Sequence, residues 1–178
     1  MKKFLNLGLQ PLANSYIKKK NLKNKEKKFK LEVGFNNKNY LVSIANTIPK
    51  EKMFNNKYPY KSSESFTMRN EFKKLSNKLN RKFKPNLLLE IGSNDGAFIK
   101  NFNRKKVLGV EPCKNLATIT KKKGYRTYCN YWNVNLAKKI TKKNKVDIIY
   151  SANTLSHIKN YSEIFRAIDI SLNKKGIL

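Results

Sequence analysis

The spacing of apolar and polar positions changes near residue 62. Before this point, apolar and polar residues alternate over 29–33 and 40–44, which predicts two short strands. Beyond it, short apolar runs take turns with segments of helical spacing, which predicts that strands and helices alternate. We therefore expect a small irregular module over residues 1–62 and an α/β domain over residues 63–178.

The α/β domain should begin with an amphipathic helix over residues 63–83, because apolar side chains recur there at spacings of three and four. Ser62 or Ser63 is expected to cap this helix, and Pro85 to end it, since proline has no N–H to donate. Further strands are predicted at 87–91, 107–110, 125–129 and 146–152, with helices starting at 97 and covering 115–123, 136–143 and 162–174. This alternation predicts a parallel sheet with helices on both faces.

The sequence ends at residues 177–178, where the next strand should only be starting. A parallel sheet without its later strands would expose apolar area and unpaired backbone groups. We therefore expect a sheet that is incomplete at the C-terminus, in a truncated or split form of a larger protein. Such a chain should be marginally stable in isolation, and a separately encoded C-terminal half would be a partner.

A buried strand followed by a glycine turn is the strongest chemical signal in the chain. Its carboxylate, glycine and polar positions are Glu90, Gly92, Ser93, Asn94, Asp95 and Gly96. Glycine takes backbone angles that a Cβ forbids, so such a turn brings main chain close to a ligand. A second apolar strand ends at Glu111 about twenty residues later, the spacing that carries an acid to the ribose hydroxyls of a nucleoside. Together the two motifs predict a site for S-adenosylmethionine (SAM).

Two other interpretations of this region stay open. A dinucleotide site would need a glycine where Asn94 stands, so that a pyrophosphate could approach the backbone; SAM has no pyrophosphate, and the substitution favours it. Alternatively, Glu90 and Glu111 are solvated strand ends of an ordinary βαβ unit. Against this stands the scarcity of acids, since the whole chain holds 11 and Glu90, Asp95 and Glu111 all fall within the motifs.

The net charge of +29 raises the question of nucleic acid as a partner, because clustered cations bind phosphate backbones. Nearly all of the excess is Lys, whereas base and phosphate recognition usually recruits Arg. The lysines are also spread along the whole chain, which is typical of a compositional drift on solvated surfaces. Nucleic acid is therefore not the expected partner, although a basic RNA methyltransferase is kept as an alternative.

Nothing in the sequence marks the chain for a membrane or for export. No apolar run reaches the roughly 20 residues that cross a bilayer, and the N-terminus lacks the continuous apolar stretch of a signal peptide. Cys113 and Cys129 are the only cysteines and are expected to stay reduced. We expect a cytoplasmic protein.

Taken in order along the chain, several motifs resemble those of the SAM-dependent sugar C-methyltransferases, which methylate a carbon of a nucleotide-linked 4-keto-6-deoxy sugar. The matching segments are residues 4–15, 53–63, 89–96, 108–112 and 152–158. The resemblance covers all 178 residues but only the first part of the family's length. It implies a Rossmann-like class I SAM methyltransferase sheet, SAM as cofactor and a nucleotide-linked keto-deoxy sugar as substrate.

The resemblance also implies a zinc-binding N-terminal module with paired Cys-x-x-Cys motifs. Here Asn36 and Asn39 stand where one pair would lie, and the other pair would precede Met1. Asparagine amide oxygens are poor zinc ligands beside thiolates or imidazoles. We therefore expect a degenerate module that holds no metal.

Carbanion chemistry follows from the same resemblance: a base takes the proton beside the ketone and donors hold the enolate oxygen. His157, the only histidine, follows the fourth strand of the α/β domain and is expected to act as a donor or auxiliary acid/base. Tyr58 and Tyr60 lie in a segment that the family places at the substrate, and packing roles for them stay equally open. Asn130 is a candidate for the adenine side, and Asn153 for the cofactor or for a turn alone.

The Glu and His implicated as the family's catalytic base belong to the region that this chain lacks. Whether the chain is an active enzyme by itself therefore stays open. The alternative to an intact enzyme is a remnant that binds SAM without turnover.

Overall fold

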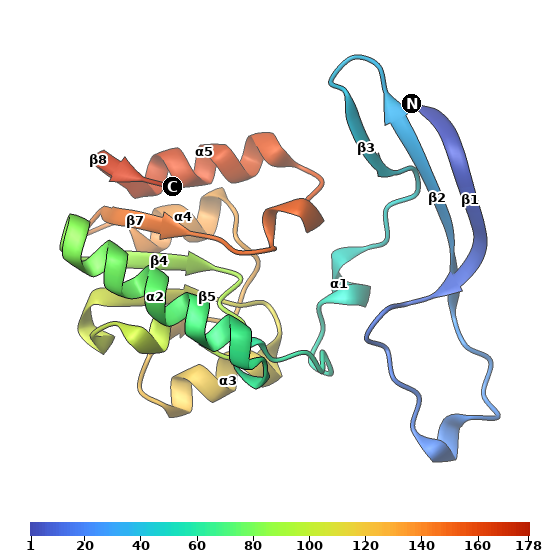
Figure 1. Ribbon diagram of the computed structural model, residues 1–178, viewed down its shortest axis with the longest axis horizontal. Coiled ribbons are helices and arrows are strands. Elements are labelled where there is room, and N and C mark those ends of the chain that lie inside the picture. Colours follow the sequence, from blue (N-terminus) through green and yellow to red (C-terminus); the bar gives the residue numbers. More distant parts are fainter. The chain divides into compact units, whose positions relative to one another are not determined.

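The computed structural model describes residues 1–178, which form two units, Met1–Pro59 and Tyr60–Leu178 (Figure 1). The first unit holds a small antiparallel sheet, and the second holds a parallel sheet with helices. None of the helices combines the length and the apolar character that a membrane span requires.

Three antiparallel strands in the order β1-β2-β3 make up the sheet of the N-terminal unit. They are β1 (Lys2–Pro11), β2 (Lys28–Asn36) and β3 (Leu41–Ile44), accompanied by a 3-10 turn η1 (Lys19–Asn21) and a short helix α1 (Lys50–Met53). Strands β2 and β3 confirm the two predicted runs. Strand β1 is not predicted by the spacing, because Gly8 and Pro11 interrupt it; Gly8, at φ +68°, lies within one of two register shifts against β2.

Glu32 on β2 is the one buried side chain of the N-terminal unit. Its carboxylate accepts hydrogen bonds from Lys3 Nζ on β1 at 2.8 Å and from Asn46 Nδ2 after β3 at 2.7 Å, and Lys30 Nζ lies 3.0 Å away. The hydrogen bonds from Lys3, Lys30 and Asn46 lower the pKa of Glu32 to about 2. A charged cluster therefore links β1, β2 and the segment after β3, in a unit that has no buried apolar side chain.

Five parallel strands form the sheet of the C-terminal unit, in the order β6-β5-β4-β7-β8. They are β4 (Leu88–Ile91), β5 (Val107–Val110), β6 (Arg126–Tyr128), β7 (Val146–Tyr150) and β8 (Leu172–Ile177). The chain starts at the central strand β4, moves outward through β5 to β6, and then crosses to β7 and β8 on the other side. The predicted α/β fold with a parallel, Rossmann-like sheet is confirmed.

Helices cover both faces of this sheet (Figure 1). They are α2 (Phe66–Phe83), α3 (Lys114–Lys122), α4 (Val134–Ile140) and α5 (Tyr161–Ser171). Because side chains alternate along a strand, Leu89 and Ile149 pack in one cluster with α4 and α5, whereas Leu88 and Ile148 pack in another with Phe72 of α2. These two apolar clusters fix the strands, and with them the loops at the strand ends.

The start of α2 differs from the prediction. The helix begins at Phe66, and its N-cap is Ser65, whose side chain accepts a hydrogen bond from Met68 N–H at 3.2 Å. Ser62 and Ser63 are therefore wrong as N-cap candidates, since both lie in the preceding 3-10 turn η2 (Ser62–Glu64). The helix ends at Phe83, just before Pro85, as predicted.

No α-helix follows the glycine turn, contrary to the prediction of a helix from residue 97. The segment forms two 3-10 turns instead, η3 (Ile99–Asn101) and η4 (Arg104–Lys106). Asn101 Nδ2 donates to Ala97 O and Phe98 O at 3.1 and 3.0 Å, and Asn103 then caps η4. Asparagine side chains that bond the local backbone compete with helix formation, which accounts for the difference.

The C-terminal helix is shorter than predicted, and the strand after it is longer. Helix α5 ends at Ser171, and residues 172–177 pair with β7 as the edge strand β8. Asn173 Nδ2 donates to Asp147 Oδ1, which fastens the start of β8 to β7. The sheet therefore has five strands within residues 88–177, rather than four and the start of a fifth.

Candidate functional site

The carboxyl ends of the parallel strands meet at one edge of the sheet, and the loops there carry most of the predicted site residues. The turn at 92–96 follows β4, Glu111 follows β5, Asn130 follows β6, and the segment 151–157 follows β7. From β4 the chain runs to β5 on one side and later to β7 on the other, which makes this edge a topological switch point. Open α/β sheets bind their ligands at such points.

Gly92 and Gly96 hold the turn in left-handed backbone conformations, at φ +75° and +82°. A Cβ at Gly92 would lie 2.2 Å from Thr154 Oγ1, and one at Gly96 would lie 2.6 Å from Thr120 Cγ2. Gly92 N–H also donates to Val110 O at 2.8 Å, which ties the turn to the end of β5. Only glycine fits these two positions. Thr154, which sequence reasoning missed, sets the loop after β7 directly against the turn.

Glu111 is buried, and backbone N–H groups hold both of its carboxylate oxygens. Asn94 N–H donates to Oε2 and Cys113 N–H donates to Oε1, each at 2.8 Å. Burial raises the pKa of Glu111, and the two N–H groups offset part of that effect. A carboxylate offers about four acceptor positions, so beside these N–H groups and the Cys113 thiol Glu111 keeps acceptor capacity for a ligand hydroxyl.

Glu90 and Ser93 are buried, and each has an oxygen without a hydrogen-bond partner: Oε2 of Glu90 and Oγ of Ser93. Burial raises the pKa of Glu90 well above its ordinary value, and the nearby charge of Glu111 adds to the effect. A buried polar atom without a partner costs about 1–3 kcal/mol. These two oxygens are therefore unsatisfied hydrogen-bonding groups beside the turn.

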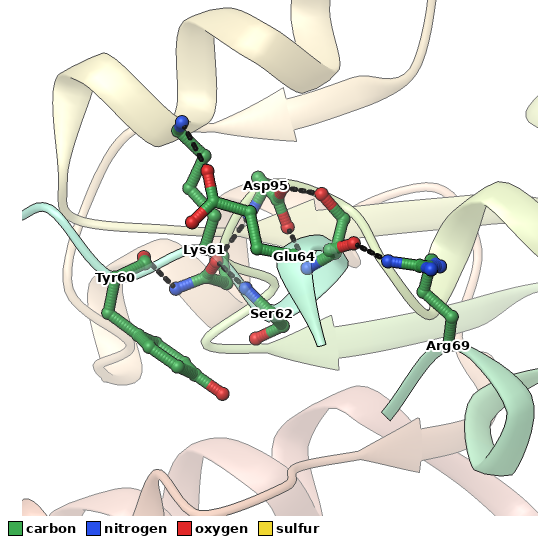
Figure 2. A network of polar contacts seen from close by, with 8 residues as sticks. Tyr60, Lys61, Ser62, Glu64, Arg69 and Asp95 are labelled. Carbon is green, nitrogen blue, oxygen red and sulfur yellow. Dashed lines mark hydrogen bonds and ion pairs between the residues drawn. The ribbon is translucent and has the colours of Figure 1, made fainter. Parts of the chain in front are cut away.

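Asn94 and Asp95, predicted as cofactor residues, bond to the segment just before α2, and Figure 2 shows Asp95 beside that segment. Asn94 Oδ1 accepts from Ser62 N–H at 2.9 Å, and Asn94 Nδ2 donates to Tyr60 O at 3.2 Å. Asp95 accepts from Ser63 N–H at 3.2 Å and from the Ser63 hydroxyl. Sequence reasoning missed this role of Ser63, because the two residues lie 32 positions apart. Contact of Asn94 or Asp95 with a cofactor stays a prediction.

The two candidate tyrosines belong to different units. Tyr58 lies in the N-terminal unit, where its ring centroid is 5.5 Å from that of Phe54. Tyr60 is the first residue of the C-terminal unit; the residue is 45% exposed, and its carbonyl accepts the bond from Asn94. Of the two, Tyr60 shares a unit with the glycine turn, and both substrate roles stay predictions.

His157, Asn153 and Asn130 lie in loops at the same edge of the sheet. His157 is exposed and ends the 3-10 turn η5 (Leu155–His157). Asn153 is exposed at φ +52°, which fits the turn role that the sequence left open. Asn130 Oδ1 accepts from Tyr131 N–H at 2.8 Å, so a local turn engages its side chain. Roles for all three in ligand binding or catalysis stay predictions.

Two family models match the sequence. One described as "Methyltransferase domain" matches residues 66–178, which is most of the C-terminal unit and more than half of the chain. The other, described as "Putative zinc binding domain", matches residues 1–54.

Similar proteins are known by sequence and by structure. The C-methyltransferase NovU of Streptomyces niveus is 23% identical over 179 residues, a match that covers 97% of this chain and 42% of NovU. The chain thus spans less than half the length of that curated relative. A crystal structure of the plantazolicin methyltransferase BamL, in complex with a triazolic desmethylPZN analog and SAH, has a TM-score of 0.51 at 22% identity and covers 65% of this chain and 47% of BamL. The similarity to BamL shows a shared fold.

A further solved structure is that of SAM-bound CalS10, an amino pentose methyltransferase from Micromonospora echinaspora. Its TM-score is 0.46 at 15% identity, over 59% of this chain and 46% of CalS10.

The residues of the N-terminal unit do not fit a zinc ion. Residues 1–59 contain neither Cys nor His, and no cluster of His, Cys, Asp or Glu in the structure could hold a metal. Asn36 and Asn39 use their amide oxygens in local turns, where they accept from Lys38 N–H at 2.9 Å and from Leu41 N–H at 3.2 Å. The side-chain hydrogen bonds that link β2 to β1 and to the segment after β3 are those that Glu32 accepts from Lys3 and Asn46.

Proposed function

Because this chain belongs to the methyltransferase domain family, we propose that it binds SAM at the carboxyl ends of β4 and β5 and methylates a carbon of a nucleotide-linked keto-deoxy sugar. The observation that supports the cofactor most is the position of Glu111. Its carboxylate is held by two N–H groups beside a turn in which only glycine fits at Gly92 and Gly96. BamL, which shares the fold, holds SAH, the demethylated form of SAM.

Each residue of the edge has a role in this proposal. Glu111 accepts hydrogen bonds from the ribose hydroxyls, and the backbone at Gly92 lets the ligand approach the main chain. Glu90 and Ser93 are assigned to the cofactor site because Oε2 of Glu90 and Oγ of Ser93 lack a hydrogen-bond partner within the chain. When bound, SAM supplies an electrophilic methyl group on a positively charged sulfur.

The sugar substrate is supported by sequence. The motifs shared with sugar C-methyltransferases occur in the same order along the chain, and the match to NovU, named a C-methyltransferase, extends over 97% of it. In the carbanion chemistry that we propose, a base takes the proton beside the ketone, the enolate carbon bonds the methyl group as its bond to sulfur breaks, and SAH leaves; donors hold the oxygen that gains charge. We assign His157 to that oxygen as a donor or auxiliary acid/base, with Tyr60 beside the substrate.

Incubation of the purified chain with methyl-labelled SAM and a nucleotide-linked 4-keto-6-deoxy sugar tests this function. The expected result is labelled sugar, located on a carbon next to the ketone by mass spectrometry and NMR. The matched control is the same nucleotide sugar with its ketone reduced to a hydroxyl, which should receive no label because its protons are not acidic. Label appearing equally on both sugars would contradict the carbanion chemistry.

Two other outcomes of the same experiment identify the alternatives. Saturable SAM binding without transfer to any sugar would make the chain a SAM-binding protein rather than an enzyme. The net charge of +29 gives RNA methylation its one supporting observation. Label in RNA, together with RNA affinity that falls steeply with salt, would favour that function.

A further inference from the structure

The segment 60–63, which leads into α2, is fastened to the glycine turn by four hydrogen bonds (Figure 2). Three of them use main-chain groups of the segment: Tyr60 O, Ser62 N–H and Ser63 N–H. The fourth is donated by the Ser63 hydroxyl to Asp95. We call these four bonds the 60–63 latch. Its only side-chain requirement within the segment is the hydroxyl at Ser63.

On the turn, the latch uses both terminal polar atoms of the Asn94 side chain and both of the Asp95 side chain. Asp95 is 3% exposed, and both of its carboxylate oxygens accept bonds from Ser63. Asn94 uses its amide oxygen and its amide nitrogen on the segment, and a left-handed backbone at φ +49° presents it there. This distinguishes Asn94 and Asp95 from Glu90 and Ser93, which each have one oxygen without a partner within the chain.

Asn94 joins the latch to Glu111. Its side chain holds the segment 60–63, while its backbone N–H donates to Glu111 Oε2 at 2.8 Å. Opening of the latch would release one of the two residues whose N–H groups orient Glu111, the carboxylate assigned to the ribose. Inside a protein such bonds reinforce one another, and a buried carboxylate that loses a donor is penalised strongly. The state of the latch and the orientation of Glu111 are therefore coupled.

We propose that Asn94 and Asp95 are positioning residues, which keep the 60–63 latch closed so that latch closure and cofactor binding stabilise each other. This inference rests on the proposed function, because it takes Glu111 as a ligand of the cofactor. Linkage makes the effect reciprocal: a ligand that binds the closed latch more tightly must favour closure by the same factor. Cofactor binding should therefore be detectable at residues 60–63.

Ser63 is the position at which the latch can be weakened with least damage. Ser63→Ala removes the hydroxyl that bonds Asp95 and leaves the main-chain bonds, whereas Ser63→Thr keeps a hydroxyl. We expect Ser63→Ala to bind S-adenosylhomocysteine (SAH) about tenfold more weakly in calorimetry, the size of effect for a bond to a charged group. Ser63→Thr should bind as the wild type does.

Hydrogen exchange at the amides of Ser62 and Ser63 reads the latch directly. SAH should slow exchange at both amides in the wild type, a response that a merely structural role of the latch would not produce. Glu64→Gln is the matched control, because it breaks the exposed pair of Glu64 with Lys61, at 2.8 Å, and touches no latch bond. Its SAH affinity and its exchange rates at these amides should equal those of the wild type.

The outcomes separate this inference from the proposed function. If the wild type binds SAH but Ser63→Ala binds it equally well, or SAH leaves the two amides unchanged, the latch is not coupled to the cofactor and the inference is wrong. A loss in Glu64→Gln equal to that in Ser63→Ala would also overturn it. If the wild type binds no SAH, the proposed function fails and the inference fails with it, which titration of the wild type alone reveals.

Discussion

Replacement of Gly92 by alanine tests the geometry of the turn. Gly92 has φ +75°, and a Cβ there would lie 2.2 Å from Thr154 Oγ1, 2.8 Å from its Cγ2 and 3.0 Å from its Cβ. Alanine therefore suffers twice: its backbone is strained, and Thr154 has to move. The movement also breaks the bond that Thr154 Oγ1 donates to Ala152 O at 3.0 Å.

The expected loss can be divided between these two causes. A left-handed conformation costs an L-residue roughly 1–2 kcal/mol, and the lost Thr154 bond costs about 1 kcal/mol. Gly92→Ala should thus lower the free energy of unfolding by about 2–3 kcal/mol. Gly124 is the matched control: it has φ +82°, but its Cβ would meet only the flexible end of Arg104, at 3.3 Å. Gly124→Ala should cost only the roughly 1–2 kcal/mol of strain.

Denaturant unfolding and SAH calorimetry on the same variants provide the assay. Thr154→Ala alone should cost about 1 kcal/mol for the lost bond to Ala152, but introduced into Gly92→Ala it should cost little more, because the bond is already broken there. Gly92→Ala should also lose SAH affinity by more than about tenfold, whereas Gly124→Ala should keep it. If Gly92→Ala costs no more than Gly124→Ala and retains SAH binding, the account of the turn is refuted.

Three further predictions concern ionisable groups. The pKa of Glu90 is raised in the native state, so the wild type loses stability as pH rises above the ordinary pKa of Glu. Glu90→Gln removes this loss and should therefore stabilise the protein more at about pH 8 than at about pH 5, measured by denaturant unfolding. An equal effect at both pH values would contradict this. Glu32, whose pKa is lowered to about 2, should stabilise the N-terminal unit above its ordinary pKa of 4.5 and cease to do so as pH falls toward 2, seen in amide NMR signals of β1 and β2; Glu32→Gln should lack this transition. His157→Ala should lower methyl transfer roughly a hundredfold or more with SAH affinity near that of the wild type, and equal losses of both would discredit its assigned role.

The elements that the spacing predicts best are those with buried side chains. Strands β4 and β5 are buried at every position, so each reads as a continuous apolar run apart from Glu90 and Gly109. Strand β1 is exposed along its whole length, and burial therefore imposes no alternation on it. Backbone hydrogen bonds pair β1 with β2, and the pattern of apolar and polar side chains does not predict them.

The site divides in the same way. The glycine turn and the acid after β5 can be predicted from the sequence because each depends on a short segment. Gly92 and Gly96 are needed for positive φ within one turn, and Glu111 follows directly on one strand. The contact between Ser63 and Asp95 spans 32 positions, and that between Gly92 and Thr154 joins the loops after β4 and β7. Such contacts exist only once the sheet has formed, and spacing along the chain does not encode them.

Calorimetric titration of the purified chain with SAH, repeated with SAM as competitor, tests the central claim most directly. The account predicts saturable binding that SAM displaces and that Glu111→Ala abolishes, with the far-UV circular dichroism of the variant unchanged. Absence of binding at saturating ligand, or full affinity in Glu111→Ala, would contradict a cofactor site at the ends of β4 and β5.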